Sequence, residues 1–298
     1  MNTYTVVATE LNLRKAPKIV SNNVIARLPQ FQLVTALAEP VDGWLNVSTI
    51  IDGAVVEGYV AFRPEFLANG VQQADTSQLE VHMPTNTNAR RSNASGRAYP
   101  LSEANMPKRD GGTSVLRLQQ VNAIIDWLAV EQSPRYLKER STTYCNIYAY
   151  DYCLRAGIYL PRVWWTGNAL AKVLQGVATP VQYGNTVTEQ RANQIYDWLK
   201  AHGTRFGWRR TFSFDDAQNI ANQGGVAMII AQRKQLERPG HVALIVPEVP
   251  GAKAVRDAAG LIKRPVTSQA GGENFRRKAP SAWWTGAQFR EFALWLHD

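Results

Sequence analysis

Two residues of the sequence have the chemistry of a thiol nucleophile and its base. Cys145 follows the run STTY (141–144) at the predicted start of a helix, where Ser and Thr can cap the helix and unpaired N–H groups favour a thiolate. His241 follows the turn RPG (238–240) and opens an apolar strand. A histidine at the edge of a sheet can reach the start of a helix packed on that sheet, so this pair predicts nucleophilic catalysis.

The second cysteine and the histidines limit other thiol and metal chemistry. Cys153 lies in the middle of the predicted helix 142–156, where a buried and inert thiol is expected. Its Cα would stand roughly 12 Å from that of Cys145, too far for a disulfide, so both residues are expected to be free thiols. The four histidines are single and show no spacing typical of a zinc site. We therefore expect neither a metal nor another cofactor.

The elements that must position these residues show helix periodicity first and strand periodicity later. Apolar residues recur at three- and four-residue steps after Gly112, and the pattern becomes that of strands after the Gly-Gly pair at 224–225. The predicted helices span 114–131, 142–156, 188–201, 214–222 and 286–297. The predicted strands span 226–233, 241–248 and 265–270. Helices followed by an antiparallel sheet predict an α+β domain over residues 113–298.

A cysteine at a helix start, followed by a histidine at a strand start, resembles the NlpC/P60 and CHAP branches of papain-like peptidoglycan hydrolases. The resemblance covers about residues 113–298, and its motifs are short. Cys145-Asn146-Ile147-Tyr148 is closer to the CHAP pattern Cys-x-x-aromatic than to the Asp-Cys-Ser-Gly of NlpC/P60 enzymes, which is absent here. The resemblance implies a papain-like fold that hydrolyses a peptidoglycan amide, either as a stem-peptide endopeptidase or as an N-acetylmuramoyl-L-alanine amidase.

These families orient the histidine with a third polar residue on the following strand. In the segment 265–275 the resemblance implies Gln269, which lies in a predicted strand and would bond the far ring nitrogen of His241. Asn274 is the alternative candidate. The turn Gly271-Gly272 offers a separate reason for the motif.

The reaction implied by these residues is acyl transfer. His241 would deprotonate Cys145, and the thiolate would attack the carbonyl carbon of the amide. The backbone N–H of Cys145, aided by Tyr144 or Asn146, would hold the oxyanion. Water would then release the acyl-enzyme, and no cofactor takes part.

The first part of the chain predicts a small β domain. Residues 4–68 consist of short alternating apolar runs separated by turn formers, a pattern typical of an antiparallel barrel. Three motifs resemble, in the right order, strands of bacterial SH3-like domains: LNLRKAP (11–17), DGWLNV (42–47) and GYV (58–60). The resemblance implies an all-β SH3-like domain over 1–70 that binds cell-wall peptides or cross-bridges. Trp44 and Tyr59 are expected to fill its core.

Between the two predicted domains, residues 71–112 are polar and rich in turn formers. They predict a linker, or a strap lying over one domain, with NARRSNASGR (88–97) as the most mobile part. Two WWT motifs, at 164–166 and 283–285, are more typical of core than of a ligand groove, and we do not count them as site residues.

Charge and hydropathy narrow the partners. The net charge of +9 is concentrated in residues 113–298, which hold 23 Lys and Arg against 14 Asp and Glu, and this suits a polyanionic bacterial wall. No nucleic-acid motif and no apolar run of about 18 residues is present, so neither nucleic acid nor membrane insertion is expected. The start of the chain lacks the pattern of a Sec signal peptide. We expect a monomer that acts on the wall, in the periplasm or outside the cell, after non-Sec export or lysis.

Two other functions fit the same residues. A cysteine acyl-transfer toxin acting on proteins would use the same Cys-His pair, although a wall-binding domain argues against it. A catalytically inert wall-binding or phage-tail protein would retain Cys145 without a reaction. Phage lysis, antibacterial attack and wall remodelling are all compatible settings for the hydrolase. Release of soluble fragments from purified sacculi tests the first rival, and the kinetics of thiol alkylation test the second.

Overall fold

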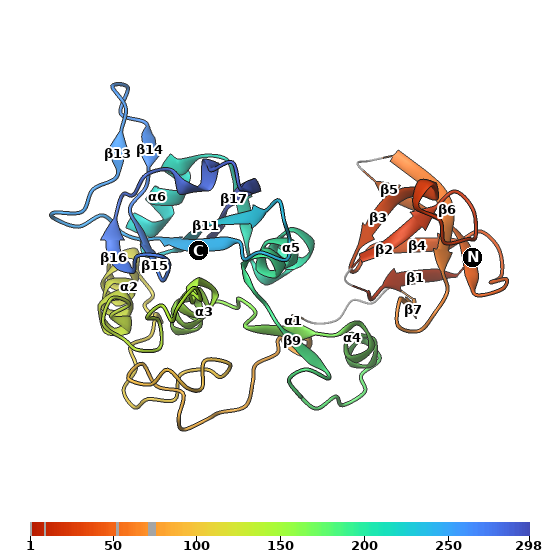
Figure 1. The fold of residues 1–298 in the computed structure, drawn as a ribbon, viewed down its shortest axis with the longest axis horizontal. Helices are drawn as coiled ribbons and strands as arrows, with labels where there is room; N and C mark the ends of the chain where they lie inside the picture. Colours follow the sequence, from red (N-terminus) through yellow and green to blue (C-terminus); the bar gives the residue numbers. More distant parts are fainter. Residues whose placement is uncertain (1, 9, 52–53, 71–75) are drawn as a thin grey trace. The chain divides into compact units, whose positions relative to one another are not determined.

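The computed structural model describes residues 2–8, 10–51, 54–70 and 76–298 (Figure 1). The chain forms two compact units. The N-terminal unit comprises Met1–Val81 and Trp164–Thr188. The C-terminal unit comprises His82–Val163 and Glu189–Asp298.

This division differs from the predicted ranges 1–70, 71–112 and 113–298, and the first range of the N-terminal unit continues to Val81. Residues 82–112 belong to the C-terminal unit, and residues 164–188 belong to the N-terminal unit. The return of the chain has a packing cause, because helix α4 (Gly167–Leu174) buries Ala171 against Val7 and Ala68. No pattern in the preceding sequence indicates this excursion.

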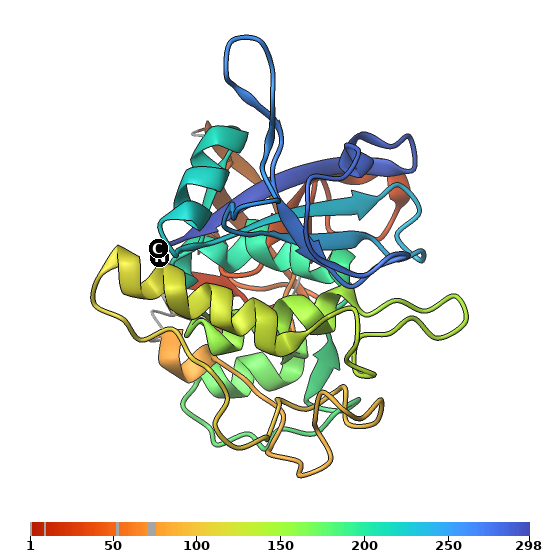
Figure 2. The same cartoon turned by 90° about the vertical axis from the view of Figure 1, so that its left-hand side faces the viewer.

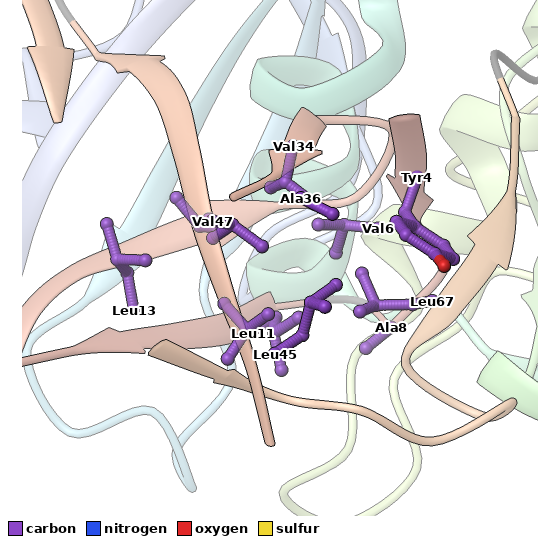
Figure 3. Packing of buried hydrophobic residues seen from close by; sticks show 12 residues of the cluster. Tyr4, Val6, Ala8, Leu11, Leu13, Val34, Ala36, Leu45, Val47 and Leu67 are labelled. Atoms are coloured by element: carbon purple, nitrogen blue, oxygen red, sulfur yellow. The ribbon is translucent and has the colours of Figure 1, made fainter. Parts of the chain in front are cut away.

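The N-terminal unit is built around one curled antiparallel sheet. Its described strands have the order β3-β2-β6-β5-β4-β1-β7, and their bounds are β1 Thr3–Val6, β2 Glu10–Arg14, β3 Val24–Pro29, β4 Leu33–Ala36, β5 Trp44–Ile51, β6 Ala54–Ala61 and β7 Leu67–Asn69. Alternate residues point inward, so Leu11 and Leu13 of β2 meet Leu45 and Val47 of β5 in the core (Figure 3). The prediction of short antiparallel strands is confirmed.

Short elements complete this unit. They are η1 (Ser21–Asn23), α1 (Thr76–Leu79) and α4. Trp164 and Trp165 are both buried, and their indole N–H groups donate to the Gln30 side-chain oxygen (3.2 Å) and to the Leu79 carbonyl (3.0 Å). The first WWT motif is therefore core, as predicted. Strand β8 (Val163–Trp165) pairs with β9 (Val187–Glu189) outside the main sheet.

The C-terminal unit has a six-stranded sheet in the described residues, with the order β10-β17-β11-β12-β15-β16. Its strands are β10 Arg209–Thr211, β11 Val226–Arg233, β12 His241–Ile245, β15 Thr267–Gln269, β16 Phe275–Lys278 and β17 Phe289–His297. The helices are α2 Ser114–Leu128, α3 Cys145–Arg155, α5 Ala192–His202 and α6 Phe214–Asn222, with the short turns η2 Gly203–Phe206 and η3 Trp283–Thr285. None of the helices in the described part of the chain is long and apolar enough to span a bilayer.

The helices cover both faces of this sheet. Ala217 and Ala221 of α6 pack on Ala227 and Ile229 of β11. Figure 1 shows α6 on one side of the sheet and α3 on the other. Successive residues of a strand point to opposite faces. Because both faces of this sheet are covered, the sequence of β11 is a nearly continuous apolar run. The α+β class predicted for this region is confirmed.

One predicted element is wrong. Residues 286–297 were expected to form a helix, but Phe289–His297 is strand β17, which lies between β10 and β11. Phe289, Phe292 and Leu296 recur at helix-like spacing, and a strand covered on both faces has no polar alternation to distinguish it. Its long pairing with β11, from Val226 opposite His297 onward, decides the outcome.

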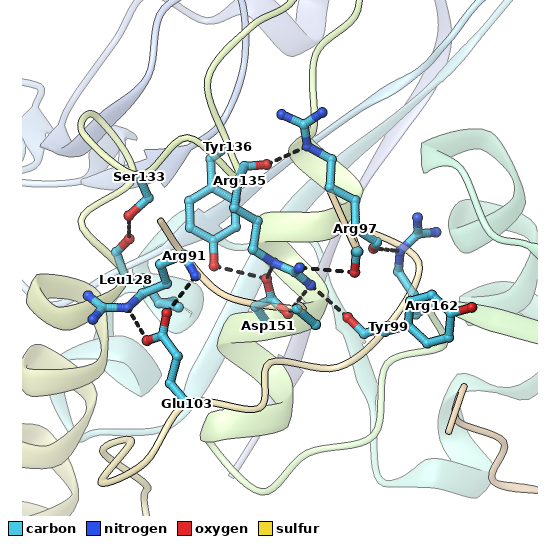
Figure 4. Close-up of polar contacts among 12 residues, drawn as sticks. Arg91, Arg97, Tyr99, Glu103, Leu128, Ser133, Arg135, Tyr136, Asp151 and Arg162 are labelled. Carbon is cyan, nitrogen blue, oxygen red and sulfur yellow. Dashed lines mark hydrogen bonds and ion pairs between the residues drawn. The ribbon is translucent and has the colours of Figure 1, made fainter. Parts of the chain in front are cut away.

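The polar segment that follows Val81 is a strap fixed to the C-terminal unit. Arg135 forms a two-pronged ion pair with Asp151 of α3, at 2.6 and 3.1 Å, and also donates to the carbonyls of Gly96 and Tyr99 (Figure 4). Arg91 donates to Glu103 through its backbone and its side chain. The run 88–97, expected to be the most mobile part, is thus held by hydrogen bonds.

A thin hairpin extends from this unit. It consists of β13 (Val255–Arg256) and β14 (Ile262–Arg264), and Figure 2 shows it projecting beyond the sheet. At its base Glu248 accepts from Arg256 at 2.9 Å and from the Ala254 N–H at 2.9 Å. The hydrogen bond from the Arg256 guanidinium is the main reason that the pKa of Glu248 is lowered to about 2.

Candidate active site

Cys145 is the first residue of α3 and only 6% of its surface is exposed. The predicted hydroxyl cap is absent, since the residue before the helix is Tyr144 and its side chain makes no capping hydrogen bond. The helix start nevertheless places a backbone hydrogen-bond donor next to the thiol. The sulfur accepts hydrogen bonds from the backbone N–H groups of Asn146 and Val242. The Asn146 N–H belongs to the first turn of the helix and the Val242 N–H to strand β12, and both favour a negative charge on the sulfur.

His241 opens β12 and is held there by the turn before it. Asn193 on α5 donates from its amide to the carbonyls of Leu236 (3.0 Å) and Arg238 (2.9 Å), which fixes the β11–β12 connection. A Cβ at Gly240 would lie 2.4 Å from the Asn193 side-chain oxygen. The turn therefore requires glycine immediately before the histidine.

Sheet register brings the third residue to the imidazole. Strands β12 and β15 are antiparallel with Leu244 opposite Ser268, and continuing this register places Gly271 opposite His241. Gln269 is then the diagonal neighbour on the same face, a distance that long side chains bridge. The His241 Nε2 to Gln269 Oε1 distance is 2.9 Å.

The Gln269 amide fixes the tautomer of the histidine. Its Nε2 donates to the Glu273 carbonyl at 3.0 Å, so its oxygen is the atom that faces His241. The oxygen can only accept, and therefore the Nε2 of His241 carries the proton. Nδ1 is left to meet the thiol of Cys145, with which His241 is hydrogen-bonded.

The two groups shift each other's proton affinity. Burial alone would raise the pKa of Cys145, but the charge and hydrogen bond of His241 and the N–H groups of Val242 and Asn146 lower it below the ordinary value. Burial would likewise lower the pKa of His241, yet the Cys145 thiolate and then the Gln269 hydrogen bond raise it. Opposite shifts of this kind favour a thiolate–imidazolium pair.

Asn274, the alternative third residue, supports the neighbouring turn instead of contacting the ring. Its amide oxygen accepts from the Gly271 N–H at 2.9 Å, and its amide nitrogen donates to the carbonyls of Val130 and Tyr136, both at 2.9 Å. A Cβ on Gly271 would come within 3.2 Å of the His241 ring. Asn274 therefore holds a glycine turn that lies against the imidazole.

The side chains proposed to aid the oxyanion are engaged elsewhere. The Tyr144 ring lies under the Arg97 guanidinium at 3.6 Å, and its hydroxyl is hydrogen-bonded to Glu139. Asn146 donates from its amide to the Gln190 carbonyl at 3.1 Å. The backbone N–H of Cys145, in the first turn of the helix, remains the donor best placed for an oxyanion.

The other thiol and the other histidines lie apart from this pair. Cys153 is fully buried, and burial raises its pKa, so the prediction of a buried thiol is confirmed. Both cysteines are free. His202 is buried, and burial lowers its pKa to about 3. No cluster of three or more potential metal ligands occurs among the residues that the structure describes.

One neighbour of the pair was not predicted. The ring of Trp283 contacts His241 edge to face, with 4.5 Å between ring centroids. Its motif was assigned to the core, and its neighbour Trp284 is indeed buried there. The repeated WWT motif was the available signal, but its position relative to His241 depends on β17, which was predicted as a helix.

The N-terminal unit has a groove of about 420 Å³ on its surface. It is lined by Pro17, Ala38, Glu39, Val41, Asp42, Trp44, Asn46 and Tyr59. Trp44 and Tyr59 were expected in the core, but they are only partly buried and form part of the groove wall. The reason is strand alternation, because Leu45, Val47 and Val60 take the inward positions of β5 and β6.

Comparisons with known proteins add little to this geometry. No family model matches the chain, and no curated protein matches it. Among solved structures, the chain is similar to NlpC2 from Trichomonas vaginalis at a TM-score of 0.21 and 11% identity, over 99% of this chain and 72% of that chain. A TM-score of this size does not establish a shared fold.

Proposed function

We propose that this protein is a peptidoglycan hydrolase that cleaves an amide bond of the stem peptide, with Cys145 as nucleophile and His241 as base. The observation that supports the chemistry is the contact series from the Cys145 thiol through His241 to the Gln269 amide. Each member sits at the start of a helix or in neighbouring strands of one unit, so the fold positions all three. The papain-like assignment of this unit is part of the proposal.

The reaction begins with the proton of the thiol. His241 takes it on Nδ1, and the Cys145 thiolate attacks the carbonyl carbon to form a tetrahedral oxyanion held by backbone N–H groups. The imidazolium then gives its proton to the leaving amine, and the C–N bond breaks to leave a thioester. His241 next deprotonates a water molecule that attacks the thioester. The carboxylic acid product leaves, and the thiol is restored.

The proposed wall-binding role belongs to the N-terminal unit. Its strand motifs resemble bacterial SH3-like domains, and its surface groove combines the aromatic side chains of Trp44 and Tyr59 with the carboxylates of Glu39 and Asp42. Aromatic walls with a few polar groups suit a short peptide segment. We therefore propose that this groove binds the peptide part of the wall, in the periplasm or outside the cell.

The decisive experiment is digestion of purified sacculi by the full chain. The wild type and Cys153→Ala should release soluble fragments, whereas Cys145→Ala should release none and should still bind the sacculi. Mass analysis of products from a defined set of muropeptides then distinguishes an endopeptidase from an amidase. If the wild type releases nothing from sacculi or muropeptides but modifies protein substrates through Cys145, the toxin alternative replaces this proposal.

Groove variants test the wall-binding part separately. Trp44→Ala and Tyr59→Ala should weaken sedimentation with sacculi and leave cleavage of small soluble muropeptides unchanged. Val55→Ala is a matched control, because this exposed residue of the same unit lies outside the groove lining. Equal sedimentation of all variants would show that the groove does not bind the wall.

A further inference from the structure

The His241 ring has an aromatic neighbour that the reaction scheme does not use. Trp283 lies in η3, just before β17, and meets the imidazole at an interplanar angle of 75°. Among the described residues, its buried indole N–H has no hydrogen-bond partner. The indole is therefore held against His241 by ring packing and not by a polar contact.

Trp283 begins a chain of aromatic contacts that ends at a cation. Its ring lies 5.8 Å from that of Phe289, and the Arg233 guanidinium carbon lies 5.2 Å from the Phe289 centroid. Arg233 also donates to the Pro239 carbonyl in the turn before His241. The positive charge of Arg233 disfavours the protonated form of His241. The rings of Trp283 and Phe289 lie between this charge and the imidazole along the chain of contacts.

The groups around the imidazole differ in their effect on its charge. Cys145 on α3 and Gln269 on β15 both favour the charged ring, and Arg233 on β11 opposes it. Gly271 and Trp283 contact the ring without a charge of their own. A cation is stabilised where it meets the face of an aromatic ring, and the rings of Trp283 and His241 are in T-shaped contact. Removal of the ring would leave space for the imidazole to turn away from the thiol.

We propose that Trp283 is a positioning residue, whose aromatic ring holds the His241 imidazole against the Cys145 thiol and favours its protonated form. The inference rests on the proposed function, because it presupposes a reactive Cys145–His241 pair. It also explains why a tryptophan with no hydrogen bond lies partly buried beside the site. Since the N–H is unused, the aromatic ring is the feature that matters, and phenylalanine should replace it.

The test is the pH dependence of Cys145 alkylation by iodoacetamide in the full chain. Trp283→Leu keeps an apolar side chain in this position but has no aromatic face. It should move the midpoint of the rate profile to higher pH by about one unit, which lowers the rate near pH 6 about tenfold. Trp283→Phe should stay within about threefold of the wild type. A change in fold stability alone moves the unfolding temperature but not this midpoint.

Trp284→Phe is the matched control, because Trp284 is buried next to Trp283 and packs on Phe214 and Phe292. It should lower the unfolding temperature and leave the alkylation midpoint unchanged. The inference is overturned if the Trp283→Leu profile superimposes on the wild type, or if Trp284→Phe shifts it equally. A wild-type midpoint at the value of an ordinary thiol would overturn the proposed function as well, so the two failures are distinguishable.

Discussion

The Tyr148 hydroxyl lies 2.6 Å from the Ser268 hydroxyl, in the buried space between α3 and β15. The bond joins the helix that begins at Cys145 to the strand that carries Gln269. Ser268 in turn donates to the Phe275 carbonyl at 3.2 Å, which extends the connection to β16. The placement of Cys145 relative to Gln269 is therefore supported by a side-chain hydrogen bond between α3 and β15.

Loss of the hydrogen bond between Tyr148 and Ser268 should disturb the placement of Cys145 relative to Gln269 without unfolding the protein. Tyr148→Phe keeps the ring packed on Tyr136 and loses one buried hydrogen bond, which costs about 0.5–1.5 kcal/mol of unfolding free energy. Urea unfolding of Tyr148→Phe, Ser268→Ala and the double variant measures the coupling between the two hydroxyls. A coupling energy of zero in this cycle would show that the two hydroxyls stabilise the fold independently.

The opposite pKa shifts of Cys145 and His241 predict a bell-shaped pH profile of kcat/KM. As pH falls through the lowered pKa of Cys145, the thiolate is protonated and the rate decreases. As pH rises through the raised pKa of His241, the leaving amine loses its proton donor and the rate decreases again. Since both shifts favour the ion pair, alkylation of Cys145 should extend to lower pH than alkylation of an ordinary thiol.

The variant His241→Ala is the control for this profile. Without the imidazole, burial is the main influence left on the Cys145 thiol, and its pKa should rise above the ordinary value. Alkylation near pH 6 should then be strongly reduced. Turnover should fall on the order of a thousandfold or more, because nucleophile and base act as a unit. Unchanged alkylation in this variant would show that His241 does not lower the pKa of the Cys145 thiol.

Gln269 and Asn274 should fail in different ways. Gln269→Ala removes the acceptor on His241 Nε2 and should lower kcat about ten- to a hundredfold, by analogy with the loss of outer-shell orienting groups at metal sites, with little change in KM. Asn274→Ala leaves the Gly271 N–H and two carbonyls without their partner, at about 1–3 kcal/mol for each buried group left unpaired.

Side-by-side assays on one muropeptide and thermal unfolding of the same samples decide between these two residues. Gln269→Glu retains an acceptor and should keep more activity than Gln269→Ala. If Asn274→Ala has the larger loss of kcat at an unchanged unfolding temperature, Asn274 and not Gln269 is the orienting residue.

The proximity of Cys145, His241 and Gln269 is predictable from sequence because each stands at a position with a local signal. A helix start, a Pro-Gly turn before an apolar run, and a polar residue within a short strand each restrict where the side chain can lie, although the predicted hydroxyl cap of the helix is absent. The hydrogen bond between His241 and Gln269 confirms the relative placement of the last two. Their catalytic roles remain proposals that the assays above test.

Other features depend on tertiary contacts that no local pattern encodes. Trp283 reaches His241 only because β17 is a strand, and the helix-like spacing of Phe289, Phe292 and Leu296 conceals this. Helix α4 joins the N-terminal unit through the packing of Ala171 on Val7 and Ala68, and no local sequence pattern indicates this contact. The strap likewise resembles a linker in composition, because several of its anchors are backbone carbonyls, such as those of Gly96 and Tyr99 that accept from Arg135.

The buried pair of Arg135 and Asp151 predicts how firmly the strap is held. Both side chains are 0% exposed, and the Tyr136 hydroxyl also donates to Asp151 at 2.9 Å. Asp151→Ala would leave a buried guanidinium without its counter-charge, so it should lower the unfolding free energy by about 3–5 kcal/mol. The double variant Arg135→Met with Asp151→Leu removes both charges and should be less destabilised than Asp151→Ala alone. Urea unfolding measures the stability of both variants.

Limited proteolysis tests how the strap is held. The run 88–97 should be cut faster in the double variant, because the carbonyls of Gly96 and Tyr99 lose their donor. Equal proteolysis of wild type and double variant would mean that other contacts, such as Arg91 with Glu103, hold the strap in place.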